Sequence, residues 1–171
     1  GAGGDKNYYC LDFFRDRLNL TQRADLIFHL HRKWEPDMVG YEKYGQMSDI
    51  EHLRDRMERE NYRFEITPLG GQMPKNDRIR RLIPLFEQHR IYLPRSHSKT
   101  DYEGVVRDLT NAFIEEEYKA FPVALHDDML DALSRMLDEE IEITWPMAED
   151  ETVRERYSTP RRKGGDNWMT A

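Results

Sequence analysis

The sequence lacks several features that mark well-defined classes of protein. Cys10 is the single cysteine among 171 residues, so the chain cannot form an internal disulfide, and no Cys/His spacing indicates a zinc site. No apolar run approaches the ~20 residues that a membrane helix needs, and no secretory signal is visible. These absences favour a reduced, intracellular setting and no membrane partner.

The chain is also short of positive charge. Its formal net charge is −7, which opposes nucleic-acid binding because such proteins usually present a basic surface. The charge is uneven, however, since residues 75–99 hold seven Lys or Arg against two acidic residues. Local fields steer ligands more than net charge does. A DNA-binding segment and a solvated helix face are both open explanations of this stretch.

What is present indicates one folded domain followed by a polar tail. Hydrophobic residues make up 38 % of the chain and aromatics 11 %, which is enough for a core. We expect a domain over residues 1–146 and a tail over 147–171. Strand-like and helix-like patterns alternate, which predicts an α/β fold with a sheet between helices. The strands are predicted at 8–14, 37–42, 62–67 and 90–94, and the helices at 21–34, around 50–57, and at 75–89, 102–118 and 127–140.

Three aspartates lie in a segment that otherwise resembles a buried helix, FPVALHDDMLDALSRML (121–137). Asp127 and Asp128 fall in the expected first turn, where capping and the helix dipole favour acidic residues. Capping does not account for Asp131, which stands one turn later and repels the first two. Like charges on one face suggest a bound cation, and hard oxygen ligands suit Mg²⁺ or Mn²⁺.

A fourth carboxylate, Glu42, ends the predicted strand in VGYEKYG. A glutamate on a central strand is costly unless it is exposed, paired or bound to a metal. A plain surface glutamate at a strand end is the alternative. Together with the helix aspartates, Glu42 could form a two-metal phosphodiester site, in which metals activate water and stabilise the leaving oxygen.

These segments together resemble the nuclease domain of the large terminase subunit of tailed bacteriophages. HDDMLDALSRML (126–137) is similar to the family's HDD-x-x-DAL signature, and VGYEKYG to the strand that carries its second catalytic acid. YYCLDFFRDR and KNDRIRRLIPLFEQHRIYLP also match family segments, so the resemblance covers about residues 8–140. It implies an RNase H-like fold, a mixed central sheet flanked by helices, related to the RuvC-type resolvases.

The resemblance also implies the site. It assigns catalysis and metal binding to Glu42, Asp128 and Asp131, with Asp127 as an adjacent candidate, and it implies two Mg²⁺ or Mn²⁺ ions. The DNA-binding candidates are the basic residues Lys75, Arg78, Arg80 and Arg81. Lys75 would contact the scissile phosphate, although a solvated lysine is an equally good explanation. His126 is either a proton carrier or ligand, or a cap beside the site.

The implied activity is metal-dependent cutting of concatemeric double-stranded DNA in the host cytoplasm. The implied partners are DNA, an ATPase motor domain, the portal and the small terminase subunit. The family's first catalytic aspartate lies on a strand that we expect before Gly1, and the chain has no G-x-x-x-x-G-K-[ST] motif. Two alternatives stay open, a RuvC-like junction resolvase and a non-catalytic DNA-binding or motor-assembly module. For Asp131→Asn we expect loss of cutting and slightly better folding, because repulsion is relieved.

Overall fold

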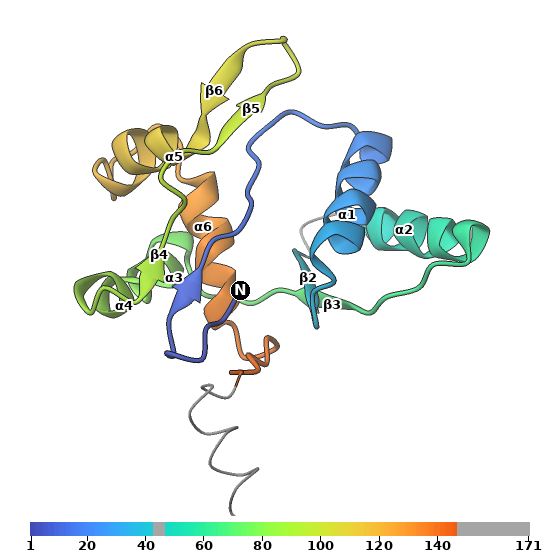
Figure 1. The fold of residues 1–171 in the computed structure, drawn as a ribbon, viewed down its shortest axis with the longest axis horizontal. Coiled ribbons are helices and arrows are strands. Elements are labelled where there is room, and N and C mark those ends of the chain that lie inside the picture. The colour runs from blue at the N-terminus through green and yellow to red at the C-terminus, as the bar shows by residue number, and fades with distance from the viewer. Residues whose placement is uncertain (43–46, 147–171) are drawn as a thin grey trace, which may run out of the picture.

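A computed structural model describes residues 1–42 and 47–146 as a mixed α/β structure (Figure 1). The helices are α1 (Leu20–Trp34), α2 (Met47–Glu60), α3 (Lys75–Arg80), α4 (Ile83–Glu87), α5 (Leu109–Ala112), the π-helix η1 (Phe113–Tyr118), α6 (Asp128–Ser134) and the 3₁₀ helix η2 (Arg135–Leu137). The strands are β1 (Tyr8–Tyr9), β2 (Val39–Glu42), β3 (Ile66–Leu69), β4 (Ile91–Tyr92), β5 (Ser98–Thr100) and β6 (Val106–Asp108). Within these residues, none of the helices has the length and apolar character to cross a membrane. The predicted tail, 147–171, lies outside the described residues.

The strands pair two by two in the described ranges. β1 pairs with β4 and β2 with β3, both in parallel, and β5 and β6 form an antiparallel hairpin. The single central sheet that the sequence predicts is therefore not formed by these residues. In the β2–β3 register, Glu42 is opposite Leu69 at the carboxyl ends of both strands.

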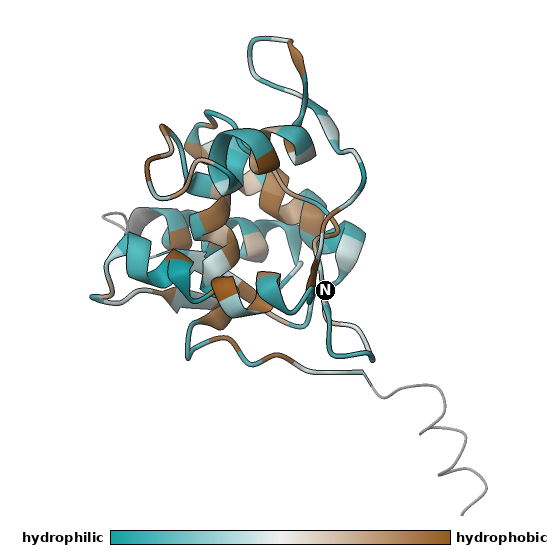
Figure 2. Ribbon diagram, turned by 90° about the vertical axis from the view of Figure 1, so that its left-hand side faces the viewer, coloured by the Kyte–Doolittle hydropathy of each residue, from teal (hydrophilic) through white to brown (hydrophobic). Residues whose placement is uncertain are grey.

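Apolar side chains in the described part gather in two clusters. One lies between α1, α2 and the β2–β3 pair and includes Phe28 and Leu53. The other lies between α3, η1 and α6 and includes Leu82, Phe113 and Leu130. Figure 1 shows these two groups of elements side by side, and Figure 2 shows apolar residues on the inner faces of the helices. The start of α6, which carries the aspartates, packs on the second cluster.

Two predicted strands differ from the observed ones. The strand predicted at 8–14 is limited to Tyr8–Tyr9, and beyond it Phe13 packs against Phe113, with ring centroids 6.5 Å apart. The strand predicted at 62–67 is shifted to Ile66–Leu69. Pro68 fits there because β3 has one neighbouring strand in the described part, and a proline is tolerated on such an edge.

Two helices predicted from apolar periodicity are interrupted, one near a proline and the other by a turn. The helix predicted at 75–89 is divided into α3 and α4 near Pro84, which lacks an N–H and lies in the first turn of the second helix. The helix predicted at 102–118 begins only at α5, because residues 98–108 form the β5–β6 hairpin. Asp101 accepts hydrogen bonds from the backbone N–H of Val105 and of Glu103, and Gly104 takes a positive φ of 80° in that turn. The helix predicted at 127–140 is shorter, since α6 continues as η2 and ends at Leu137.

Candidate carboxylate cluster at the start of helix α6

The three aspartates of α6 and its N-cap converge on one cation, the ammonium of Lys75. Its Nζ lies 2.6 Å from Asp127 Oδ1, 3.3 Å from Asp128 Oδ1 and 3.9 Å from Asp131 Oδ2. Lys75 is the first residue of α3, which packs against α6. Burial lowers the pKa of Lys75, but Asp127 and Asp128 outweigh it and raise the pKa above its usual range, so the ammonium is charged. The structure thus brings these sequence-predicted carboxylates together around a positive charge.

Asp131 has a second and firmer partner in Arg78. The Arg78 guanidinium donates from Nε to Asp131 Oδ1 at 2.7 Å and from Nη2 to Oδ2 at 2.8 Å, a bidentate pair. The Arg78 side chain is 3 % exposed and also donates to the backbone oxygen of Met73. The repulsion expected among the aspartates is therefore offset within the chain, and for this reason we now expect Asp131→Asn to destabilise the fold rather than to improve folding.

Capping does not explain why aspartates occupy these positions. Asp127 is the N-cap residue of α6, yet its side chain makes no capping hydrogen bond. The backbone N–H groups of Met129 and Leu130 donate instead to Glu117 Oε2, each at 2.9 Å. Asp128 points outward with 67 % of its side chain exposed. The carboxylates are consequently directed to Lys75 and to solvent rather than to the helix backbone.

Glu42 does not join the aspartates. It ends β2 and forms an ion pair with Arg135, in which Nη2 donates to Glu42 Oε1. Arg135 lies one helical turn after Asp131. Glu42 therefore contacts the helix one turn beyond the aspartates, where α6 continues as η2. Arg135 is 8 % exposed and also donates to Asp138, which accepts from Arg81 at 2.5 Å. This network joins β2 to the end of α6.

The four basic residues predicted to bind DNA divide into two kinds. Arg78 and Arg81 are occupied inside the chain, Arg78 by Asp131 and Arg81 by Asp138 and the backbone oxygen of Leu137. Arg80 is 54 % exposed and pairs with the equally exposed Asp77. Lys75 is 38 % exposed beside the aspartates. Lys75 and Arg80 are thus the two members that face solvent, and their role in DNA binding stays a prediction.

Sequence reasoning missed the buried carboxylate of Asp12. Its side chain is 4 % exposed and is contacted by Lys33 Nζ at 2.7 Å, His97 Nε2 at 2.9 Å and Lys99 Nζ at 3.1 Å. Burial raises the pKa of Asp12, but Lys33 and Lys99 outweigh it and hold the value at about 2. The sequence feature that could have identified Asp12 is its position as a carboxylate inside the aromatic run YYCLDFF. Asp12 joins α1 to the β5–β6 hairpin.

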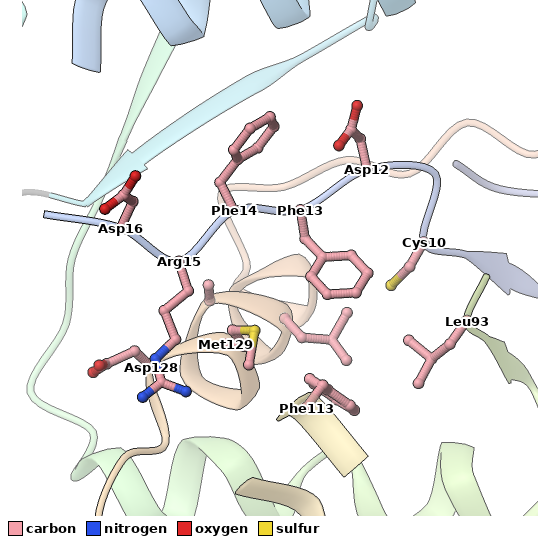
Figure 3. Close-up of a pocket in the computed structure, with 12 residues that line it drawn as sticks. Cys10, Asp12, Phe13, Phe14, Arg15, Asp16, Leu93, Phe113, Asp128 and Met129 are labelled. Carbon is pink, nitrogen blue, oxygen red and sulfur yellow. The ribbon is translucent and has the colours of Figure 1, made fainter. Parts of the chain in front are cut away.

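A pocket of about 500 Å³ adjoins the cluster. Figure 3 shows the side chains of Phe13, Leu93, Phe113 and Met129 turned toward one another in it, while Asp12 points away. Asp128 contributes to its wall. A second, more polar pocket of about 450 Å³ contains both His126 and Asp128. His126 therefore lies near the cluster, and its role as ligand, proton carrier or cap stays a prediction.

The chemistry of this donor set fits the divalent cation that the sequence resemblance implies. Asp127, Asp128 and Asp131 supply hard oxygen ligands, and the Lys75 ammonium occupies the position between them. Over residues 1–42 and 47–146, no three His, Cys, Asp or Glu side chains are arranged to hold a metal ion directly.

Comparison of the chain with family models, curated proteins and solved structures gives no match.

Proposed function

We propose that this chain is the metal-dependent endonuclease domain of a phage DNA-packaging terminase, with an RNase H-like arrangement, that cuts concatemeric double-stranded DNA. One observation carries the proposal: Asp127, Asp128 and Asp131 surround a single cationic position at the start of a helix and are not used to cap it. Carboxylate oxygens are the hard ligands that suit Mg²⁺ or Mn²⁺. The motif resemblance over residues 8–140 supplies the reaction class.

The roles of the side chains follow from their contacts. Asp128 is exposed, and among the described residues its ion-pair partner is Lys75 alone, so it is the ligand most free to move onto a metal ion. Asp131 is fixed by Arg78 and supplies a rigid ligand, and Asp127 lies between the two. When bound, Mg²⁺ or Mn²⁺ supplies an activated water and stabilises the leaving oxygen. Glu42 would complete a two-ion site after release from Arg135.

DNA would approach on the solvent side of α3. Lys75, once displaced from the carboxylates, would leave a free ammonium beside the scissile phosphate. Arg80 lies on the exposed face of the same helix and needs only to exchange Asp77 for a backbone phosphate. The partners proposed from the resemblance are double-stranded DNA, an ATPase motor domain, the portal and the small terminase subunit.

A second candidate is a non-catalytic DNA-binding or motor-assembly module. A specific observation favours it, because each carboxylate of the candidate site already has a cation within the chain. Asp131 pairs with Arg78, Asp127 and Asp128 with Lys75, and Glu42 with Arg135. Carboxylates neutralised in this way are expected in a structural ion-pair network as well as in an enzyme without its metal ion.

The two candidates are separated by a cleavage assay on the full-length protein. Linear duplex, supercoiled plasmid and a four-way junction are incubated with Mn²⁺, with Mg²⁺ or with EDTA. We expect metal-dependent cutting of duplex, abolished by EDTA and reduced by roughly two orders of magnitude in Asp128→Asn, because a ligand of the ion is lost. Asp128 is the residue of choice because its exposure keeps folding intact. Glu58→Gln, a change at a carboxylate of α2 with a similar exposure of 64 %, is the control.

Each result has a defined consequence. Strong preference for the junction would indicate a RuvC-like resolvase instead. DNA binding without cutting by the full-length protein would favour the assembly module. Parental cutting by Asp128→Asn would remove that residue from the site.

A further inference from the structure

The start of helix α6 is capped from another helix. The first N–H groups of an α-helix have no partner within the helix and need acceptors. At α6 the N-cap side chain, Asp127, does not serve as one. Glu117 accepts from the N–H groups of both Met129 and Leu130 through a single oxygen, Oε2. The carboxylate that normally sits at the N-cap position has therefore been replaced by one from 10 residues earlier in the chain.

Burying the Glu117 carboxylate costs free energy, which indicates that this residue has a specific role. Its side chain is 0 % exposed, and its nearest cation, Arg15 Nη1, lies 3.6 Å from Oε1. Burial raises the pKa of the Glu117 carboxyl, as expected for a charge moved out of water. It lies in the π-helix η1, and π-helical segments are rare and frequently occur at functional sites. The neighbouring Glu116, by contrast, is 57 % exposed and pairs with Arg15 at the surface.

We infer that Glu117 is a positioning residue for the aspartate cluster. By satisfying the N–H groups of α6 it leaves the Asp127 carboxylate free to face Lys75, 2.6 Å away, and therefore free to take a metal ion. Without Glu117, Asp127 is the side chain placed to cap the helix, and capping would turn its carboxylate away from the cation position. The capping role stands on the contacts alone, whereas its consequence for metal binding rests on the proposed function.

The capping role is tested by a stability cycle between Glu117 and Asp127. In the parent protein, Asp127→Ala should change Tm by less than about 2 °C, because Asp127 is not a cap. In a Glu117→Ala background the same change should lower Tm by roughly 4 °C more, because Asp127 has become the cap. An equal cost in both backgrounds would overturn the inference. Should Glu117→Ala fail to fold, Glu117→Gln replaces it in the cycle, and there we expect Asp127→Ala to stay nearly neutral because the amide oxygen still accepts.

Positioning is tested by Mn²⁺ titration calorimetry on the folded variants. We expect Glu117→Ala to bind Mn²⁺ roughly 10-fold more weakly than the parent, since residues that orient ligands typically contribute on this order. Glu117→Gln should recover most of that affinity, because it keeps the acceptor without the charge. Glu116→Ala is the matched control and should bind like the parent.

The outcomes separate the two hypotheses. Parental affinity in Glu117→Ala would show that Glu117 is a structural cap with no influence on the cluster. Absence of Mn²⁺ binding by the parent would refute the proposed metal site, and the stability cycle would still decide whether Glu117 caps α6 in place of Asp127.

Discussion

Replacing Asp131 by asparagine should destabilise the fold, and the structure sets the size of the effect. Asp131 is the partner of Arg78, whose side chain is 3 % exposed and donates two hydrogen bonds to it. Removing one member of a buried ion pair costs about 3–5 kcal/mol, because the other charge stays buried without compensation. Asp131 is itself 13 % exposed, and asparagine keeps one acceptor oxygen. We therefore expect the lower end, about 3 kcal/mol, which is a fall in Tm of roughly 6–12 °C for a domain of this size.

The assay is urea unfolding followed by circular dichroism in EDTA, so that no metal contributes. Asp128→Asn is the matched control, since Asp128 has 67 % of its side chain exposed and should lose less than about 0.5 kcal/mol. The double variant Arg78→Met, Asp131→Asn removes both charges. Its loss of stability should be smaller, by roughly 1.5 kcal/mol or more, than the summed losses of the two single variants. An Asp131→Asn variant as stable as the parent would refute the assignment of the buried pair.

Two further predictions concern pH and salt. The pKa of Asp12 falls from an ordinary 3.8 to about 2 in the folded chain, which corresponds to about 2 kcal/mol of stability. Because the folded pKa is the lower one, this stability is present above pH 4 and is lost as pH falls through 2. Asp12→Asn should therefore be less stable by about 2 kcal/mol at pH 7, and the difference should disappear in acid, as followed by urea unfolding; a difference independent of pH would contradict the pairing with Lys33 and Lys99. Arg80→Glu should weaken duplex binding and lower the salt slope by about 0.9 for each phosphate that Arg80 neutralises, with Asp77→Asn as a control at its ion-pair partner; an unchanged slope in a filter-binding titration would remove Arg80 from the DNA surface.

Local sequence patterns predicted the elements whose signals are continuous along the chain. The helix expected at 21–34 is α1, Leu20–Trp34, which has a capping box between Asn19 and Gln22 and a regular apolar face. The strand ending at Glu42 and a helix starting at the aspartates were also predicted to within a few residues. Where a turn or a proline competed with an apolar stripe, as at Asp101 and Pro84, the stripe was the weaker signal and the prediction was wrong.

The partners of the carboxylates could not be predicted, because they are distant in sequence. Lys75 lies 53 residues from Asp128, and Arg78 lies 53 residues from Asp131. Arg135 lies 93 residues from Glu42. Periodicity describes the face of one helix, and it carries no information on which side chain of another helix is directed to that face. The sequence therefore indicated where negative charge gathers and left open how the chain compensates it.

The two cations of the cluster differ in how firmly they are held, and this difference bears on how the proposed metal ion would bind. Arg78 is buried, and its planar guanidinium matches both oxygens of Asp131, so its removal would leave a carboxylate without its main partner. Lys75 is 38 % exposed, and its ammonium is a point charge on a flexible stem without a fixed geometry. If the proposed divalent ion binds, Lys75 rather than Arg78 would be the cation that it displaces. Asp131 would then stay oriented while Asp127 and Asp128 adjust, so one rigid ligand and two adaptable ones would face the incoming ion.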